Sequence, residues 1–498
     1  MMPDFSILSL PILVLLPLIF GLYILTPLCP QSEVFVRRFA KGASVFHLFY
    51  TGLFLAFYNK GFVSMWQPTW IGTIGCKFGF VMDELALLMT ILTSLIFTLA
   101  IIASKAHIRK AHKLYYALFL FFESTILGIF NAGDAFTFFL FWELELIPAY
   151  FLIAHWGEGV ESKRSAMKFV LYTFIGSLFM LLGLILLHYF SFLVTGSMNA
   201  EISAYDMNGV GLILQVLVSV LLLIGFGVKL PIVPIHSWLP DAHTDAPTPV
   251  SMVLAGVLLK TGAYAIIRFN LQLLPEAFKT LAPILAVIAL VNIIFAALVA
   301  YAQTDIKRIV AFSSISNMGL VLLGICSINK IGLTGSIFHM VAHGLITAGL
   351  FMVCGIVFLR CKTRDITCLG GLAQKMPRLF GFATIIVVAA VGMPLLPAFI
   401  GEVLTVLGAM AAEFSAIMKF IALLSLPMLI CASCYMLKFL HQGFFGQLSV
   451  CKPNSDIMNH EFVVLSIIVL CLLVLGVYPM SIINIVNASF IMGGNGIW

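Results

Sequence analysis

Six ionisable side chains lie inside long apolar stretches of this sequence, where a charge is costly. A charged group at the centre of a bilayer costs roughly 2.5–3.5 kcal/mol on insertion scales, so such residues usually face a protein interior or water and carry function. Amines, imidazoles and carboxylates in that setting can pass protons to one another. The sequence therefore predicts a buried proton pathway made of Glu143, Lys229, Lys260, His339, His343 and Glu402.

The two lysines are the least ordinary members of this set. Lys229 ends a long apolar run and is followed by Pro231 and Pro234, which break a helix. Lys260 lies about twelve residues into the next apolar stretch, which is mid-membrane at 1.5 Å per residue. Lysine suits proton relay because desolvation lowers its proton affinity and a nearby carboxylate raises it. We expect Glu143 to be that carboxylate for Lys229.

The remaining members would extend the pathway sideways, parallel to the membrane. Glu143 lies near the centre of its apolar stretch, and Glu145 is two residues further on, on a different helix face. His339 and His343 are four residues apart and share a face. Glu402 follows two prolines deep in a later stretch. We expect a route from Glu143 and Lys229 through Lys260 and the histidines to Glu402.

Other interpretations of these residues stay open. The histidine pair lacks an evident third ligand and an H-E-x-x-H motif, so no metal is predicted, and the pair could instead join helices by hydrogen bonds. The ten cysteines include one CxxC, Cys431 to Cys434, inside an apolar stretch, where packing is favoured over chemistry. All the buried charges could also be internal salt bridges of a membrane scaffold.

The composition fixes the class of protein. Of 498 residues, 62% are hydrophobic and 10% charged, with a mean hydropathy of +1.12, so polar groups cannot cover a globular surface. The sequence predicts an all-α integral membrane protein with a single polytopic domain, 1–498. Its fourteen predicted spans lie near residues 5–26, 42–58, 79–103, 114–131, 133–155, 166–190, 210–230, 248–270, 281–301, 308–327, 332–358, 379–411, 416–439 and 461–484.

Lys and Arg residues are distributed unevenly between the turns. Of the 27, 19 lie after odd-numbered spans, 5 in the opposite turns and 3 within spans, namely Lys229, Lys260 and Lys419. The positive-inside rule therefore places both termini on the outer side. Lys419 lies near the start of its span and is interpreted as an interfacial anchor. The first span has no cleavage signature, and the net charge of +6 indicates no nucleic-acid partner.

Spans 7 and 12 share a pattern that indicates an internal symmetry. Each contains two prolines three residues apart, Pro231 with Pro234 and Pro394 with Pro397, beside a buried charge. Spans five places apart cross the membrane in opposite directions, and paired broken helices of opposite sense indicate inverted repeats. We expect N-terminal helices 1–3 in residues 1–113, two five-helix repeats in 114–270 and 281–440, and helix 14 in 461–498.

The sequence resembles the antiporter-like subunits of respiratory complex I, the NADH:quinone oxidoreductase, and most of all subunit M, the type called subunit 4 in mitochondria. The resemblance runs in order from about residue 80 to 440. It implies fourteen spans with two inverted five-helix repeats, and quinone reduction in partner subunits that drives proton translocation here. The matching stretches are FFLFWELELIPAYFLIAHWG, GVKLPIVPIHSWLPDAHTDAPTPVSMVLAGVLLKTGAYAIIRF, AQTDIKRIVAFSSISNMG, HMVAHGLITAGLF, CLGGLAQKMPRL and FIGEV.

The resemblance also assigns roles to individual residues. Glu143 matches the carboxylate that pairs with the broken-helix lysine, Lys229. Lys260 matches the central lysine, His343 the histidine of span 11, and Glu402 the terminal residue of span 12. His339 is a further candidate.

The resemblance implies partners as well as residues. No cofactor is expected in this chain, because it has no GxGxxG, P-loop or Fe–S cysteine spacing; quinone, FMN and Fe–S clusters belong to partner subunits. Expected partners are other membrane subunits, including neighbouring antiporter-like ones, together with lipid, water and protons. A bacterial inner membrane is expected, with the mitochondrial inner and thylakoid membranes as alternatives.

Two departures and several alternatives accompany the resemblance. Asn317 replaces a histidine that often lies on the central polar axis, so water or His339 has to bridge there. The break of span 12 reads MPLLPAF in place of LPGTSGF. The stretch FWELELIP is also similar to the D-type subunit of cyanobacterial and plastid relatives, which use ferredoxin. A cation/proton antiporter or a membrane-bound hydrogenase subunit shares the fold, although those relatives usually carry lysine at the position of Glu402.

Overall fold

The protein is built almost wholly of helices, as its apolar sequence predicts. The structure, a computed structural model, describes residues 5–56, 64–106, 108, 110–447, 453 and 455–492. Among these residues, eleven helices are long and apolar enough to cross a membrane, and three shorter apolar helices accompany them. The predicted all-α membrane fold is confirmed, while the count of fourteen spans and the repeat boundaries stay predictions.

The elements follow one another along the chain with short connections. The first half contains α1 (Phe5–Leu25), α2 (Glu33–Ala56), α3 (Glu84–Ala103), α4 (His112–Phe130), α5 (Ala135–Leu144), α6 (Leu146–Trp156), α7 (Ser162–Thr195), α8 (Leu212–Lys229), α9 (Trp238–Asp245), α10 (Thr248–Val253), α11 (Leu259–Ala265) and the π-helical segments η4 (Leu254–Leu258) and η5 (Ile266–Leu271). The second half contains α12 (Pro275–Ala302), α13 (Ile306–Cys326), α14 (Lys330–Cys361), α15 (Leu372–Lys375), α16 (Pro377–Ala390), α17 (Pro397–Met410), α18 (Ala416–Phe444), α19 (Asn459–Val477) and α20 (Met480–Met492).

Two small antiparallel sheets lie in the connection between α2 and α3, where no strand was predicted. One pairs β1 (Ser64–Trp66) with β4 (Phe80–Met82), and the other pairs β2 (Thr69–Ile71) with β3 (Cys76–Lys77). Short 3-10 turns complete the chain: η1 (Gly72–Ile74), η2 (Ser104–Ala106), η3 (Ile202–Ala204) and η6 (Ile366–Cys368).

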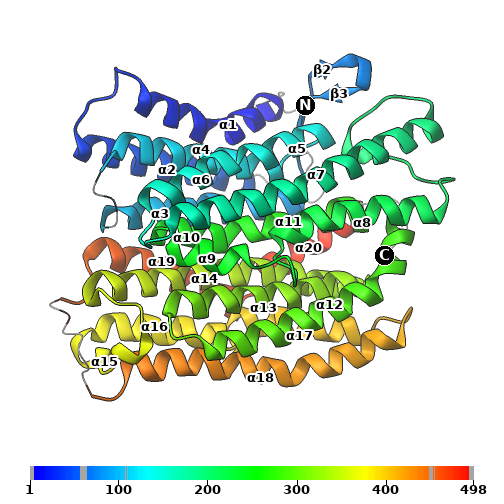
Figure 1. Ribbon diagram of the computed structural model, residues 1–498. Coiled ribbons are helices and arrows are strands. Elements are labelled where there is room, and N and C mark those ends of the chain that lie inside the picture. The colour runs from blue at the N-terminus through cyan, green and yellow to red at the C-terminus, as the bar shows by residue number, and fades with distance from the viewer. Residues whose placement is uncertain are drawn as a thin grey trace.

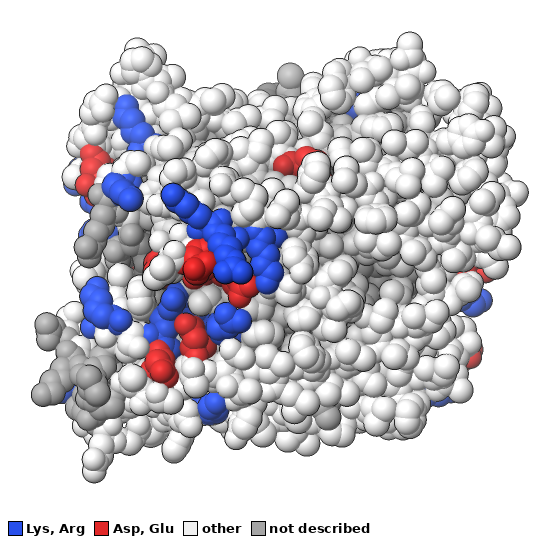
Figure 2. Space-filling view, viewed as in Figure 1, with Lys and Arg blue, Asp and Glu red and all other residues white. Residues whose placement is uncertain are grey.

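The helices run side by side and form one broad slab (Figure 1). Helices α1 and α2 lie at one edge and α18 at the opposite edge, with α10, α11 and α14 between them. Lys and Arg side chains gather toward one end of the helices, at the left of the view, whereas most of the visible face carries no charge (Figure 2). This distribution agrees with the uneven count of basic residues between turns.

The start of the second helix differs from the prediction. The apolar pattern put it near residue 42, but α2 begins at Glu33. Its first turns carry Arg37, Arg38 and Lys41, which a count of apolar residues excludes from a span. Long basic side chains can reach the interface from inside a helix end, so these residues are compatible with continuous helix.

Both predicted helix breaks are present. The chain leaves helical geometry between the end of α8 at Lys229 and the start of α9 at Trp238, and again between α16 and α17. Asn292 of α12 holds the first break: its Oδ1 accepts the backbone N–H of Val233 at 2.7 Å and its Nδ2 donates to the carbonyl of Pro231 at 3.2 Å. One side chain thus satisfies two backbone groups that the break leaves free.

Asn292→Leu is expected to destabilise the protein by about 2 kcal/mol or more, because each unpaired buried backbone group costs about 1–3 kcal/mol. The thermal unfolding midpoint of the purified protein should fall accordingly. The neighbouring variant Val291→Ala, at a side chain exposed on the outer face, provides the control. Equal midpoints for the two variants would show that the break does not depend on Asn292.

Candidate functional site

Lys229 lies at the end of α8 in an ion pair with Glu145, and both side chains are fully buried. The Lys229 Nζ also donates to the carbonyl oxygen of Trp142 at 3.3 Å and lies 3.5 Å from the centroid of the Trp142 ring. A carboxylate, a carbonyl and an aromatic face therefore surround the ammonium. A buried charge is tolerated where it is paired in this way.

This pairing corrects the sequence prediction, which gave Lys229 the partner Glu143. In the structure α5 and α6 meet at Glu145 and together form one 22-residue apolar span, residues 135–156. Glu145 keeps right-handed helical backbone angles, so no break in the span accounts for the change of partner. Pro148 has no N–H to bond the carbonyl four residues earlier, that of Leu144.

Glu143 nevertheless remains part of the same site. It lies beside Ser177 of α7, is partly exposed, and is close enough to Lys229 to interact with it electrostatically. Two carboxyl groups therefore face one ammonium, and in a site of low dielectric at least one of them is favoured as the neutral acid. Sequence reasoning noted Glu145 but did not recognise it as the partner, because spacing alone does not show which face of the span meets Lys229.

Lys260 lies at the centre of the bundle in a distorted helix. The α-helical turn that carries it, α11, is flanked by the π-helical segments η4 and η5, which sequence reasoning missed. The Nζ donates to the carbonyl of Ala255 at 2.5 Å and contacts Nδ1 of His343 in α14 at 2.8 Å. Two positive charges at that separation would repel strongly, so the Lys260–His343 pair holds at most one.

The polar line continues from His343 along α14. The ring centroids of His343 and His339 are 6.3 Å apart, and Nε2 of His339 donates to Oδ1 of Asn317 at 3.0 Å. Asn317 occupies the position where the resemblance expected a histidine, and His339 makes the contact that the sequence predicted as one way to bridge it. Three side chains from α13 and α14 therefore continue the line from Lys260.

Glu402 lies beyond His339 on α17 and is 6% exposed. Glycines allow the close approach: a Cβ at Gly401 would lie 2.9 Å from Nδ1 of His339, and a Cβ at Gly392 would lie 2.3 Å from Glu402 Oε2. The carboxyl group lines a groove of about 480 Å³ between α17 and α18, which also contains Ser433. Glu402 is thus positioned between the histidines and the outer surface.

The structure therefore divides the six predicted residues into three groups. Glu143 lies with Lys229, Lys260 lies with His343 and His339, and Glu402 stands alone at the groove. The two lysines are on helices that touch, because a Cβ at Gly262 of α11 would lie 2.7 Å from the backbone nitrogen of Leu230, the residue after Lys229. The groups are neighbours in one interior layer, although no direct contact links the first to the second.

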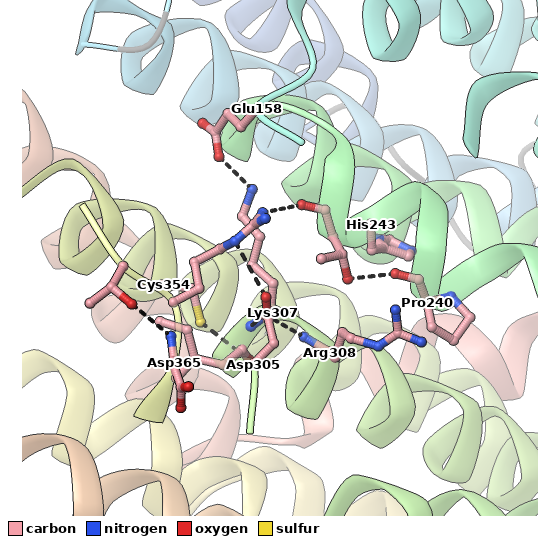
Figure 3. Close-up of polar contacts among 12 residues, drawn as sticks. Glu158, Pro240, His243, Asp305, Lys307, Arg308, Cys354 and Asp365 are labelled. Carbon is pink, nitrogen blue, oxygen red and sulfur yellow. Dashed lines mark hydrogen bonds and ion pairs between the residues drawn. The ribbon is translucent and has the colours of Figure 1, made fainter. Parts of the chain in front are cut away.

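The second half of the broken helix, α9, ends in a cluster of charges that we interpret as structural. Lys307 of α13 donates to Glu158 at 2.8 Å and to the Ala246 carbonyl at 2.9 Å, and Figure 3 shows Lys307 pointing toward Glu158. Asp241 accepts hydrogen bonds from Lys168 at 2.7 Å and from Arg308 at 3.2 Å. These contacts fix α9 to α7 and α13.

Asp241 and His243 both lie in the stretch WLPDAH, but the surroundings of His243 are different. It is fully buried and its ring stacks on Phe351 with centroids 5.1 Å apart. Among the described residues, neither of its ring nitrogens has a hydrogen-bond partner. The described part of the chain also has no group of three or more His, Cys, Asp or Glu side chains that could hold a metal ion.

Comparison with known proteins places this arrangement in a defined group. Residues 132–428 match the family model described as "NADH:quinone oxidoreductase/Mrp antiporter, TM". The chain is 39% identical over 485 residues to an NAD(P)H-quinone oxidoreductase chain 4 of Synechococcus sp. (strain JA-2-3B'a(2-13)), covering 94% of this chain and 89% of that one. It is 37% identical over 495 residues to the chloroplastic chain 4 of Chlorokybus atmophyticus, covering 96% and 94%.

Two solved structures share the fold over nearly the whole chain. A chain of respiratory complex I from Thermus thermophilus superposes with a TM-score of 0.85 at 28% identity, covering 97% of this chain and all of that one. A chain of the Mrp complex from Dietzia sp. DQ12-45-1b gives 0.87 at 20% identity, covering 100% and 99%. At that identity the second likeness concerns the fold alone.

Proposed function

This chain belongs to the family of membrane subunits described as NADH:quinone oxidoreductase/Mrp antiporter, and on that premise we propose that it is a proton-translocating subunit of an NAD(P)H-quinone oxidoreductase. The relatives at 37–39% identity are named as chain 4 of such enzymes. In this proposal the redox chemistry, with quinone, flavin and Fe–S clusters, takes place in partner subunits. The chain supplies the proton path, next to neighbouring membrane subunits.

The contact between Lys260 and His343 is the observation that carries the proposal. Nζ and Nδ1 are 2.8 Å apart and fully buried, so an N–H of the lysine can donate to the lone pair of the imidazole. When the lysine is an ammonium, that proton can pass to Nδ1 with almost no movement of the heavy atoms, which leaves a neutral amine beside an imidazolium. A site of this kind stores one proton at the middle of the membrane.

In the proposed mechanism, the ion pair of Lys229 with Glu145 controls the proton affinity of the neighbouring groups. While the ammonium is held by Glu145, its charge is compensated. When it moves toward Glu143, or when a carboxyl group there takes a proton, that compensation changes and the affinity of neighbouring groups for protons changes with it. The contact between α8 and α11 at Gly262 provides a short path for this electrostatic influence to Lys260.

Gentle extraction followed by mass spectrometry tests the assembly. We expect quinone-site, Fe–S and other antiporter-like subunits to purify with this chain in stoichiometric amounts. Membrane vesicles from cells that lack the chain should lose proton uptake driven by quinone reduction, and the wild-type chain should restore it. Purification with small antiporter subunits only would contradict the proposal.

A cation/proton antiporter is the second candidate, because the family model covers both classes and the Mrp chain shares the fold. The carboxylate at Glu402 favours the first candidate, since the antiporter relatives usually carry lysine there. The discriminating measurement is proton movement in vesicles without a redox substrate. Exchange driven by a sodium or potassium gradient alone would support the antiporter.

Glu402→Lys is expected to retain part of the pumping activity, because both carboxyl and amine groups titrate and both can exchange protons with water in the groove. Glu402→Leu, which cannot titrate, is the matched control and should lose more. The measurement is the proton-to-electron ratio of assembled complex in vesicles. Complete loss in the lysine variant with intact assembly would show that the carboxylate itself is required.

A further inference from the structure

A second buried ionisable pair lies outside the line described above, among the N-terminal helices. His47 of α2 and Glu123 of α4 are 1% and 0% exposed, and Nδ1 of His47 is 3.0 Å from Oε1 of Glu123. The proposed pathway does not use either residue. Helices α1, α2 and α4 lie together at one edge of the slab, and α3 packs against α2 and α4 on one side and against α10 and α14 on the other (Figure 1).

The contacts of His47 determine how many protons the pair holds. Its Nε2 is 2.9 Å from the carbonyl oxygen of Leu13 in α1. A carbonyl only accepts hydrogen bonds, so Nε2 carries a hydrogen. Two lone pairs facing each other at 3.0 Å would repel, so one further proton lies on Nδ1 or on Oε1. The pair is therefore either imidazolium with carboxylate or imidazole with carboxylic acid.

These two forms interconvert by the transfer of one proton. The N–H bond at Nδ1 breaks as the O–H bond at Oε1 forms, no net charge changes, and no heavy atom has to move far. The second carboxyl oxygen, Oε2, has no hydrogen-bond partner among the described residues. That oxygen is free to accept a proton from outside the pair.

Buried polar side chains follow one face of α2 and one face of α3. On α2, Ser44, His47 and Thr51 follow at spacings of three and four residues, and on α3 three hydroxyl side chains follow at spacings of four. All six are buried. The contacts between the two faces and α4 are Thr98 Oγ1 to the Ser44 carbonyl at 3.1 Å, Thr51 Oγ1 to Ser94 Oγ at 3.1 Å, and Asn131 Nδ2 to Thr90 Oγ1 at 2.9 Å.

Hydroxyl groups alone suffice to join membrane helices, and they do so here without any ionisable group. A buried histidine and glutamate add a desolvation cost that replacement by apolar side chains would avoid. Among the described residues, His47 is the only ionisable group found to interact with Glu123. The other acidic, basic and imidazole side chains of these helices lie toward helix ends: Glu33, Arg37, Arg38, Lys41, Glu84, His112 and Lys113. The tyrosines of the four helices are Tyr23, Tyr50, Tyr115 and Tyr116, and Tyr50 follows His47 by three residues on α2.

We propose that His47 and Glu123 form a second proton-binding site of this chain, separate from the line through Lys260 and Glu402. Its ligand is a single proton shared between imidazole and carboxyl group, and the hydroxyl row on α2 and α3 is the polar surrounding through which protons reach it. The site stands on its own contacts and would add to the proposed pathway. Apolar side chains of α3, Leu92 and Ile96, face α14 and η4 and so lie between the site and the helices of the Lys260 line.

The double variant His47→Leu/Glu123→Leu tests this in the assembled complex. Both ionisable groups are replaced by apolar side chains of similar size, so a merely structural pair predicts normal assembly and normal pumping. We expect normal assembly and a fall in pumping rate of at least about twofold. Tyr115→Phe is the control, because it removes another buried polar contact of α4, the 2.9 Å bond to Ser104 of η2, without touching the pair.

Infrared difference spectra of the whole complex give a second readout that does not depend on pumping. A step in pH should change a carboxyl band that is absent in Glu123→Gln. An unchanged difference spectrum in that variant would overturn the proposal even if the double variant did not assemble, and so would normal pumping by an assembled double variant. If Lys260→Met loses pumping while the double variant pumps normally, the proposed function stands and the second proton-binding site is excluded.

Discussion

Lys260→Met is expected to lower proton pumping by the assembled complex at least about a hundredfold, the lower end of what a positioned proton carrier contributes. Methionine has a similar length and no charge, and it fills the space between η4 and η5 without burying an ammonium. Among the described residues Lys260 has no acidic partner, so an apolar side chain there leaves no uncompensated buried charge. The variant should therefore assemble and reduce quinone while the proton held with His343 is lost.

The control for this variant is Lys419→Met, which removes the third lysine predicted to lie within a span, but one whose side chain is exposed rather than buried. Lys419 lies at the start of α18 with an exposed side chain, in agreement with its interpretation as an anchor. Pumping is measured as acidification of vesicles during quinone reduction and normalised to the amount of complex. Equal pumping by the two methionine variants would exclude Lys260 as a proton carrier.

Proline positions made the broken helices predictable. Pro231 with Pro234 and Pro394 with Pro397 located both interruptions, because a proline has no N–H and clashes with the preceding turn. The same rule does not extend to Pro148: α5 and α6 meet at Glu145 with helical backbone angles, and residues 135–156 remain one span.

Contacts across helices could not be predicted from spacing. The His339–Asn317 bond joins residues on α13 and α14 and depends on how those helices rotate toward each other. Asn292 stabilises a break about 60 residues away in sequence, and nothing in its own segment indicates that role. The π-helical segments around Lys260 likewise depend on packing, since the sequence from Leu254 to Leu271 has an ordinary apolar pattern.

The family resemblance located the site around Lys229, and the structure changed the partner assigned to that lysine. Its identification of the family is confirmed by the comparisons, and its assignment of Glu143 as a proton-transfer residue stays a prediction. The resemblance paired Lys229 with Glu143, whereas in this chain the ion-pair partner is Glu145, two residues further on. The site therefore has two acidic side chains where the resemblance assigned one.

Glu145→Gln and Glu143→Gln are expected to differ in stability while both lose pumping. Glu145→Gln leaves the fully buried Lys229 ammonium without its ion-pair partner, and removal of one partner of a buried pair costs about 3–5 kcal/mol. The amount of assembled complex and its unfolding temperature should fall. Glu143 is partly exposed beside Ser177, so Glu143→Gln should assemble normally and still abolish or severely reduce pumping.

The two outcomes separate the roles of the two carboxyl groups because assembly and pumping are measured on the same membranes. Restoration of stability by the double change Glu145→Gln/Lys229→Met, which removes both partners, would show that the loss came from the uncompensated ammonium. Normal stability and normal proton-to-electron ratio in Glu145→Gln would show that the ion pair seen here has no part in either. Normal pumping in Glu143→Gln would place the acidic function on Glu145 alone, and Lys229 would then have a single carboxylate as its counter-ion throughout the cycle.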